Sequence, residues 1–190
     1  MVSLTKEEAA TGIYGAWRLA CHDRGGMRCF DTSLDGFWKS FYAALFAAPG
    51  FVFLKLLSLS GLGAEFPLFR FLALQSVIYF ISWFAFPLVV IYVTDALDRW
   101  ERYFDFIVAF NWSNVLQMAL LVVVTILVTA GVLPGALGML ATLVATLAII
   151  YYEWFIAVTA LQITGGQAAG VVAVDIVIGI LLNSVVAGIL

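Results

Sequence analysis

The chain has 190 residues, of which 64% are hydrophobic and only 11% are charged. Soluble domains carry about 45–50% apolar and about 25% charged residues, so this composition excludes a water-soluble globule. A net charge of −3 and a pI near 4.9 also argue against a protein that binds nucleic acid. We therefore expect an all-α, polytopic integral membrane protein.

Residues 1–36 predict a polar cytoplasmic arm that contains an amphipathic helix. Thr5 and Glu8 have the spacing of a capping box, in which each side chain binds a free amide at the helix start. Apolar residues recur at helical spacing up to Trp17, and Gly25-Gly26 predicts the helix stop. The helix then lies on the membrane with Trp17 as an anchor, or packs on the bundle's own cytoplasmic face.

The arm also holds Cys21, His22 and Cys29, with Asp23 and Asp31 nearby. Structural zinc sites need four ligands at short recurring spacings, and the chain has one His and two Cys in all. We therefore expect no metal site and two reduced cysteines.

Residues 37–190 predict a domain of five transmembrane helices. A helix needs about 20 apolar residues to cross a bilayer, and the apolar runs cover 37–61, 67–94, 110–131, 136–154 and 168–190. Pro49-Gly50 interrupts the first run, which is therefore expected to be a kinked span. A re-entrant hairpin that turns at this dipeptide is the alternative.

The densest charge cluster, residues 95–105, follows the second apolar run. Asp95 and Arg99, and likewise Asp98 and Arg102, are four residues apart with the acid first, which is the favourable order on a helix. The spacing predicts a helical extension of the second span with two ion pairs.

Basic residues set the orientation, because they gather on the cytoplasmic side of bacterial membrane proteins. With five spans, one side receives Lys6, Arg18, Arg24, Arg28, Lys39, Arg99 and Arg102, and the other only Lys55 and Arg70. We expect a multi-pass protein of a bacterial-type inner membrane, with a cytoplasmic N-terminus and an external C-terminus.

Asp175 is the one acid with a long apolar sequence on both sides, and together with Asn183 and Glu153 it makes a candidate intramembrane polar site. A carboxylate at a lipid-facing centre costs about 2.5–3.5 kcal/mol, so Asp175 is expected to face the bundle or water. Three interpretations stay open: a structural acid bonded to a neighbour, a coupling residue in a proton or cation path, or a contact with another subunit.

Glu153 follows two tyrosines and precedes Trp154, a cluster typical of the headgroup layer. We therefore expect a solvated interfacial residue at the end of the fourth span. If Glu153 points inward instead, it approaches Asp175, and that arrangement favours transport.

The sequence contains no Gly-x-Ser-x-Gly, Walker or His-Glu-x-x-His motif. Neither an enzyme nor a cofactor is expected.

The cytoplasmic arm, the five closely spaced spans and the stretch from Tyr152 to Ala169 resemble the bacterial branch of the Yip (Ypt-interacting protein) family of five-span membrane proteins. The acidic-aromatic N-terminal motif of the eukaryotic members is absent here, so neither a GTPase partner nor any functional residue is carried over. The resemblance implies a non-enzymatic membrane organiser or accessory subunit.

The first expected function is an accessory or organising subunit that binds lipids, other membrane proteins or further copies of itself. Its interaction face would lie on the cytoplasmic side and comprise Trp17, Arg24, Arg28, Arg99 and Arg102. The alternative is a small ion-coupled transporter or channel component that uses Asp175.

Overall fold

A computed structural model describes residues 3–59 and 68–189, and in these two ranges every regular element is helical. The α-helices are α1 (Lys6–Ala20), α2 (Leu34–Ser40), α3 (Ala43–Ser58), α4 (Leu68–Ala96), α5 (Tyr103–Thr129), α6 (Ala136–Leu161) and α7 (Gly165–Ile189). Two short 3₁₀ helices are η1 (Arg24–Cys29) and η2 (Trp100–Arg102). Within the described ranges, five helical segments are long and apolar enough to cross a membrane: Leu34–Ser58, Leu68–Ala96, Trp100–Thr129, Ala136–Leu161 and Gly165–Val185.

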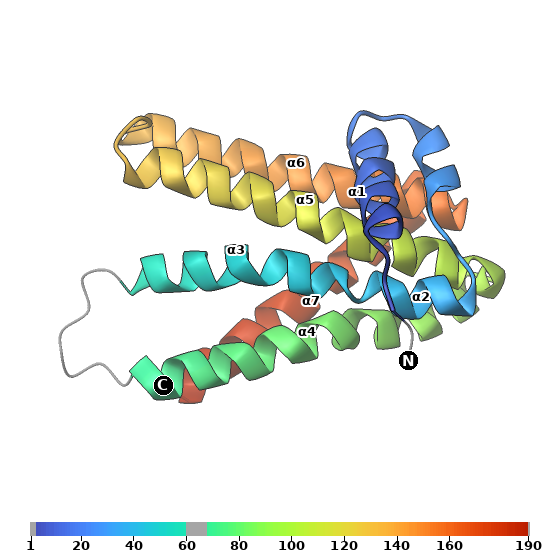
Figure 1. Cartoon of the computed structure of the whole chain (residues 1–190), viewed down its shortest axis with the longest axis horizontal. Coiled ribbons are helices and arrows are strands. Elements are labelled where there is room, and N and C mark those ends of the chain that lie inside the picture. The colour runs from blue at the N-terminus through green and yellow to red at the C-terminus, as the bar shows by residue number, and fades with distance from the viewer. Residues whose placement is uncertain (1–2, 60–67, 190) are drawn as a thin grey trace.

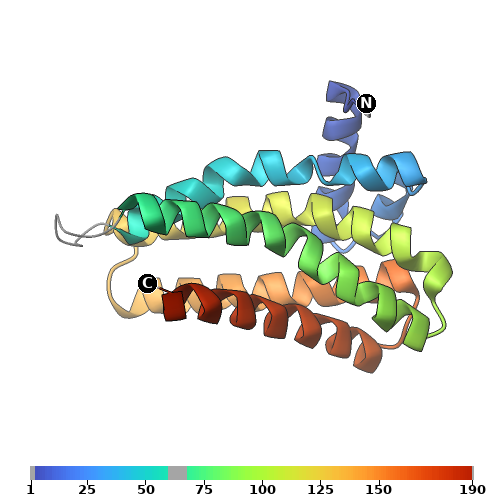
Figure 2. The ribbon, with the colours of Figure 1, turned by 90° about the horizontal axis from the view of Figure 1, so that it is seen from below.

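The long helices run along one axis in alternating directions, and α1 crosses them near one end (Figure 1). Helix α5 is the centre of the bundle, because it packs against α1, α2, α3 and α6, while α7 packs against α6 and α4. The turned view shows α6 and α7 side by side beneath the other helices (Figure 2). We call the end that carries α1, η1 and η2 the arm end, and the opposite one the far end.

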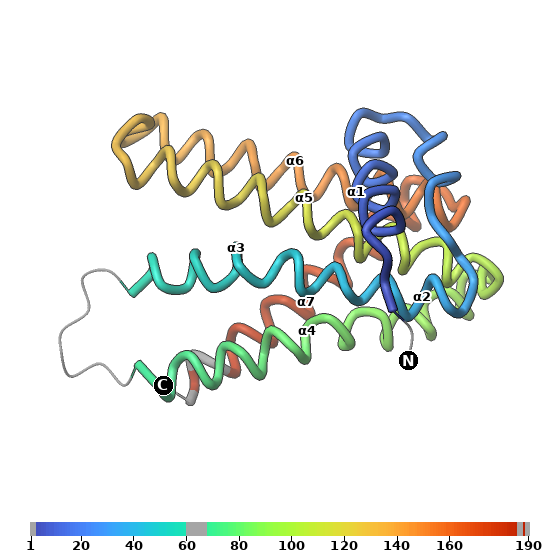
Figure 3. The backbone as a smooth tube through the Cα atoms, viewed as in Figure 1, coloured from blue at the N-terminus to red at the C-terminus, as the bar shows by residue number. Residues whose placement is uncertain are grey.

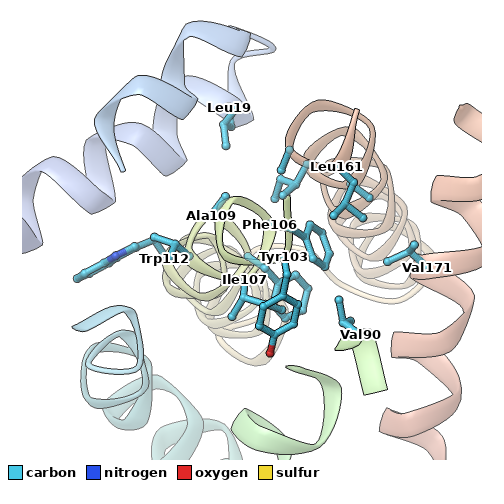
Figure 4. Packing of buried hydrophobic residues seen from close by; sticks show 14 of the residues in the cluster. Leu19, Val90, Tyr103, Phe106, Ile107, Ala109, Trp112, Leu161 and Val171 are labelled. Atoms are coloured by element: carbon cyan, nitrogen blue, oxygen red, sulfur yellow. The ribbon is translucent and has the colours of Figure 1, made fainter. Parts of the chain in front are cut away.

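The best-packed core lies at the arm end, around the first half of α5. Phe106 and Ile107 of α5 are fully buried and pack with residues from four other helices, namely Leu19, Val90, Leu161 and Val171 (Figure 4). Toward the far end, by contrast, α6 exposes Leu140, Leu143 and Leu147. An apolar surface of this kind is suited to lipid rather than to water.

Helix α1 begins as expected, since Thr5 and Glu8 form the capping box. The expected stop at Gly25-Gly26 is wrong, because α1 ends at Ala20 and both glycines lie in η1. The left-handed residue after the helix is His22, at φ 62°. The amides of His22 and Asp23 return to the carbonyls of Leu19 and Arg18, which is the Schellman motif that ends many helices.

The re-entrant alternative for the first apolar run is also wrong, because α3 continues as a helix through Pro49 and Gly50 (Figure 3). The interruption falls earlier, at Phe41-Tyr42 between α2 and α3. Gly50 serves close packing: a Cβ there would lie 2.7 Å from Met118 Cγ on α5.

The helical extension expected over residues 95–105 does not form. Helix α4 ends at Ala96, and Asp98 adopts a positive φ of 56°, so the four-residue spacing no longer places acid and base on one helix face. Arg99 instead donates to the carbonyl of Asp98, and Arg102 pairs with Asp105 at 3.0 Å.

Three span boundaries differ from the expected ones, and the differences matter for the acids. Helix α5 starts at Tyr103 instead of near 110, α6 runs on to Leu161 instead of ending near 154, and α7 starts at Gly165 instead of near 168. Glu153 therefore lies inside a helix and not at its end.

An ion pair between Glu8 and Lys39 ties α1 to α2, with 2.8 Å between Oε1 and Nζ. The hydrogen bond from Lys39, helped by the Thr5 amide, lowers the pKa of Glu8 from 4.5 to about 2. A carboxyl group whose pKa is lower in the folded state stabilises the fold above its unfolded pKa, and loses that effect as pH falls through its folded pKa.

We therefore expect Glu8→Gln to lower the melting temperature of the detergent-solubilised protein at pH 7. The difference from the wild type should shrink as pH falls from about 4.5 toward about 2. Glu7→Gln, at an exposed neighbouring position, is the control and should change little. A Glu8→Gln deficit that is equally large at pH 7 and pH 2.5 would contradict the ion-pair explanation.

Candidate functional site: an acid pair inside the bundle

Glu153 and Asp175 lie on α6 and α7, which pack against each other as an antiparallel pair. Glu153 is only 8% exposed, so the expectation of a solvated side chain is wrong. The aromatic cluster divides between two faces of α6, with Tyr151 exposed and Glu153 directed into the bundle. The alternative in which Glu153 points inward and approaches Asp175 is the one that the structure has.

The two acids lie at the same level. At a rise of 1.5 Å per residue, Glu153 is about 12 Å from the end of α6, and Asp175 is about 15 Å from the start of α7. Both of these helix ends are at the arm end (Figure 1), and the carboxyl groups are close enough to interact electrostatically.

Gln117 of α5 is the third polar residue of this site. It is 7% exposed, and its side chain lies beside the Glu153 carboxyl group. Its Nε2 atom is buried without a hydrogen-bond partner, which is an unusual and costly condition for an amide. The sequence signal for Gln117 is an amide side chain inside an apolar run. This signal alone does not indicate a functional site, because such amides also form contacts between membrane helices.

Asp175 borders a cavity of about 230 Å³ between α3, α4, α5 and α7. The other polar residues of its wall are Tyr79, Ser82, Asn111 and Asn114. Asn111 is 1% exposed and donates from Nδ2 to Ser40 Oγ at 2.8 Å, a bond that joins α5 to α2. Asp175, but not Glu153, therefore lines a cavity that combines polar and aromatic residues.

Asn183 does not belong to this site. It lies two helical turns beyond Asp175, its side chain is exposed, and Nδ2 donates to the carbonyl of Gly179 in its own helix. An amide that bonds the preceding turn is a local feature of the helix. Asn183 therefore does not extend the site, contrary to the expectation from the sequence.

Tyr152 connects the arm to the acid pair. Its hydroxyl donates to the carbonyl of Ala16 in α1 at 2.6 Å, which leaves Ser113 Oγ as the donor of the 2.8 Å bond between the two hydroxyls. His22 stacks on Tyr151, with ring centroids 5.1 Å apart. Helix α1 is thus fixed to the helical turn that carries Glu153.

The residues of the expected interaction face lie on elements that share the arm end (Figure 1). Trp17 is 58% exposed, and Arg24 and Arg28 are exposed as well. Arg99 and Arg102 are half-buried and bond to Asp98 and Asp105. The structure therefore leaves three of the five side chains open and engages the other two locally.

No protein-family model, curated protein or solved structure matches this chain.

Proposed function

We propose that this chain is a multi-pass membrane protein that conducts a small monovalent cation, with Asp175 and Glu153 as its intramembrane charges. The observation that carries the proposal is the burial of Glu153 at the level of Asp175, which itself lines a cavity. In a hydrocarbon core about 30 Å thick, both acids would lie near the midplane. Acids at that depth are expensive and usually belong to ion pathways.

The charges at the two ends support the orientation expected from the sequence. Seven basic residues belong to the arm end, and Lys55 lies near the opposite end of α3. We propose on this basis a bacterial-type inner membrane, a cytoplasmic arm and an external C-terminus. Lipids and other membrane proteins, including further copies of this chain, are the proposed partners, and no enzymatic activity is proposed.

Currents on solid-supported membranes test the conduction proposal, because they register any transported charge. We expect vesicles with the purified protein to give transient currents when a gradient of H⁺, Na⁺, K⁺ or tetramethylammonium is imposed. Asp175→Asn should return the current to that of protein-free vesicles. If the wild type gives no current with any of the four cations, the proposal is wrong.

The accessory role keeps one specific support, the exposed Trp17 beside Arg24 and Arg28 at the arm end. Exposed tryptophan and arginine are typical of interaction surfaces. Purification in mild detergent distinguishes the accessory role from cation conduction. A defined membrane-protein complex that is lost in Trp17→Ala, together with an absence of currents, would favour the accessory role.

A further inference from the structure

Five of the twelve described residues that line the cavity beside Asp175 are aromatic. Rings from three helices line it, namely Phe51 of α3, Tyr79, Trp83 and Phe86 of α4, and Phe110 of α5. They form two groups of touching rings. Tyr79 contacts Phe51 and Trp83, with centroids 4.4 and 6.1 Å away, and the Phe86 and Phe110 centroids lie 4.6 Å apart. Asp175 is the one ionisable acid in this wall.

Both hydroxyl groups of the wall, and one amide hydrogen of each of its asparagines, are already bonded within the protein. The hydroxyl of Tyr79 donates to the carbonyl of Ala44, and Ser82 donates to the carbonyl of Tyr79. Asn111 and Asn114 donate from Nδ2 to Ser40 Oγ and to the carbonyl of Phe110. The groups that remain for a ligand are the carboxylate, the side-chain oxygens, the aromatic rings, and the neutral donors of the Trp83 indole and of the second amide hydrogens of Asn111 and Asn114.

This chemistry selects a cation. None of the described residues that line the cavity is Lys, Arg or His, so an anion would meet only a negative charge. A bare alkali or divalent ion needs about six oxygen ligands around it. The six side-chain oxygens of this wall come from residues on three different helices and share the wall with five aromatic residues. Aromatic faces attract organic ammonium ions through the ring quadrupole, most strongly where water is excluded.

We propose that this cavity binds a small alkylammonium cation, with Asp175 as its counter-ion and the rings of Tyr79, Trp83 and Phe86 around its alkyl groups. The size agrees, because about 230 Å³ is below the roughly 300–1,000 Å³ of sites for drug-sized ligands. The inference deepens the proposed conduction by naming the class of cation, and it rests on that function only for its physiological meaning.

Calorimetric titration of the full-length protein in detergent with tetramethylammonium chloride tests the inference. We expect saturable binding, no comparable heat from potassium chloride, and none from neopentyl alcohol, a neutral molecule of similar shape. Asp175→Asn and Trp83→Leu should each weaken binding by about tenfold or more. Trp83→Phe keeps a ring and should weaken it less than Trp83→Leu.

Trp100→Leu, at an exposed tryptophan outside the cavity, is the matched control and should bind as the wild type does. Asp175→Asn preserves the side-chain shape, so its circular dichroism and gel-filtration profile should match the wild type. Absent saturation, equal binding of the neutral alcohol, or wild-type binding by a folded Asp175→Asn would each overturn the inference. Binding without currents would refute only the conduction proposal, and H⁺ or Na⁺ currents without tetramethylammonium binding would refute only the inference.

Discussion

Glu153→Gln and Asp175→Asn should each remove most or all of the cation current. The double variant should carry no less current than the less conductive of the two single variants. A unit charge about 4 Å from a cation contributes about 4 kcal/mol at an effective dielectric constant of 20. A loss of well over tenfold is therefore expected from either substitution. Groups that act as one unit give strongly non-additive effects, and the two carboxyl groups interact within the bundle.

Asp98→Asn supplies the matched control, because it also removes one carboxylate but at an exposed position between α4 and η2. Its current should equal that of the wild type. Gln117→Leu adds a second comparison, since Gln117 lies beside Glu153 without bearing charge. We expect it to conduct less than the wild type and more than Glu153→Gln. Full current in a folded Glu153→Gln variant would show that Glu153 is a structural acid.

The part of the fold that can be predicted from the sequence is the number and type of its long helices. Composition and run length predict five apolar helices, and the described part of the chain contains five segments that meet both conditions. Length is a strong signal because the bilayer fixes it. Boundaries are weaker, because a helix continues past the apolar run wherever its next residues can pack on neighbouring helices, as Tyr103 and Leu161 do here.

The sequence predicts only one member of the acid pair, Asp175, as an intramembrane acid. Asp175 stands out because long apolar sequences flank it on both sides. Glu153 was assigned to the headgroup layer because tyrosine and tryptophan beside an acid are typical of that layer. What placed it inside the bundle is the continuation of α6 to Leu161 and the docking of α1 on Tyr152. Both depend on contacts between segments more than a hundred residues apart.

In the arm, too, the local pattern is predictable from the sequence and the contacts between distant segments are not. The capping box at Thr5 is a local pattern and forms as predicted, whereas the glycines chosen as the helix stop serve another purpose. Gly26 lies against the backbone of Gly15, where a Cβ would approach the Gly15 carbonyl oxygen to 2.6 Å. Glycine is needed wherever two backbones approach closely, and one sequence cannot distinguish that need from a helix stop.

Gly12→Leu should detach the arm from the bundle. A Cβ at Gly12 would lie 2.5 Å from Cε2 of Trp112, and Trp112 is a buried residue of α5 that has little room to move. Overpacking of this kind costs about 1–3 kcal/mol, and four extra carbons should exceed the effect of Gly12→Ala. We expect a lower melting temperature and faster proteolysis within residues 3–33 than in the wild type.

The comparison that isolates packing from helix propensity is Gly170→Ala. A Cβ at Gly170 meets no atom within 4 Å, so alanine there should be neutral or slightly stabilising, by about 0.5–1 kcal/mol. Because Tyr152 bonds Ala16 of α1 and adjoins Glu153, the detached arm should also alter the cation current. An unchanged current in a Gly12→Leu protein whose arm is cleaved quickly would show that the acid pair works independently of α1.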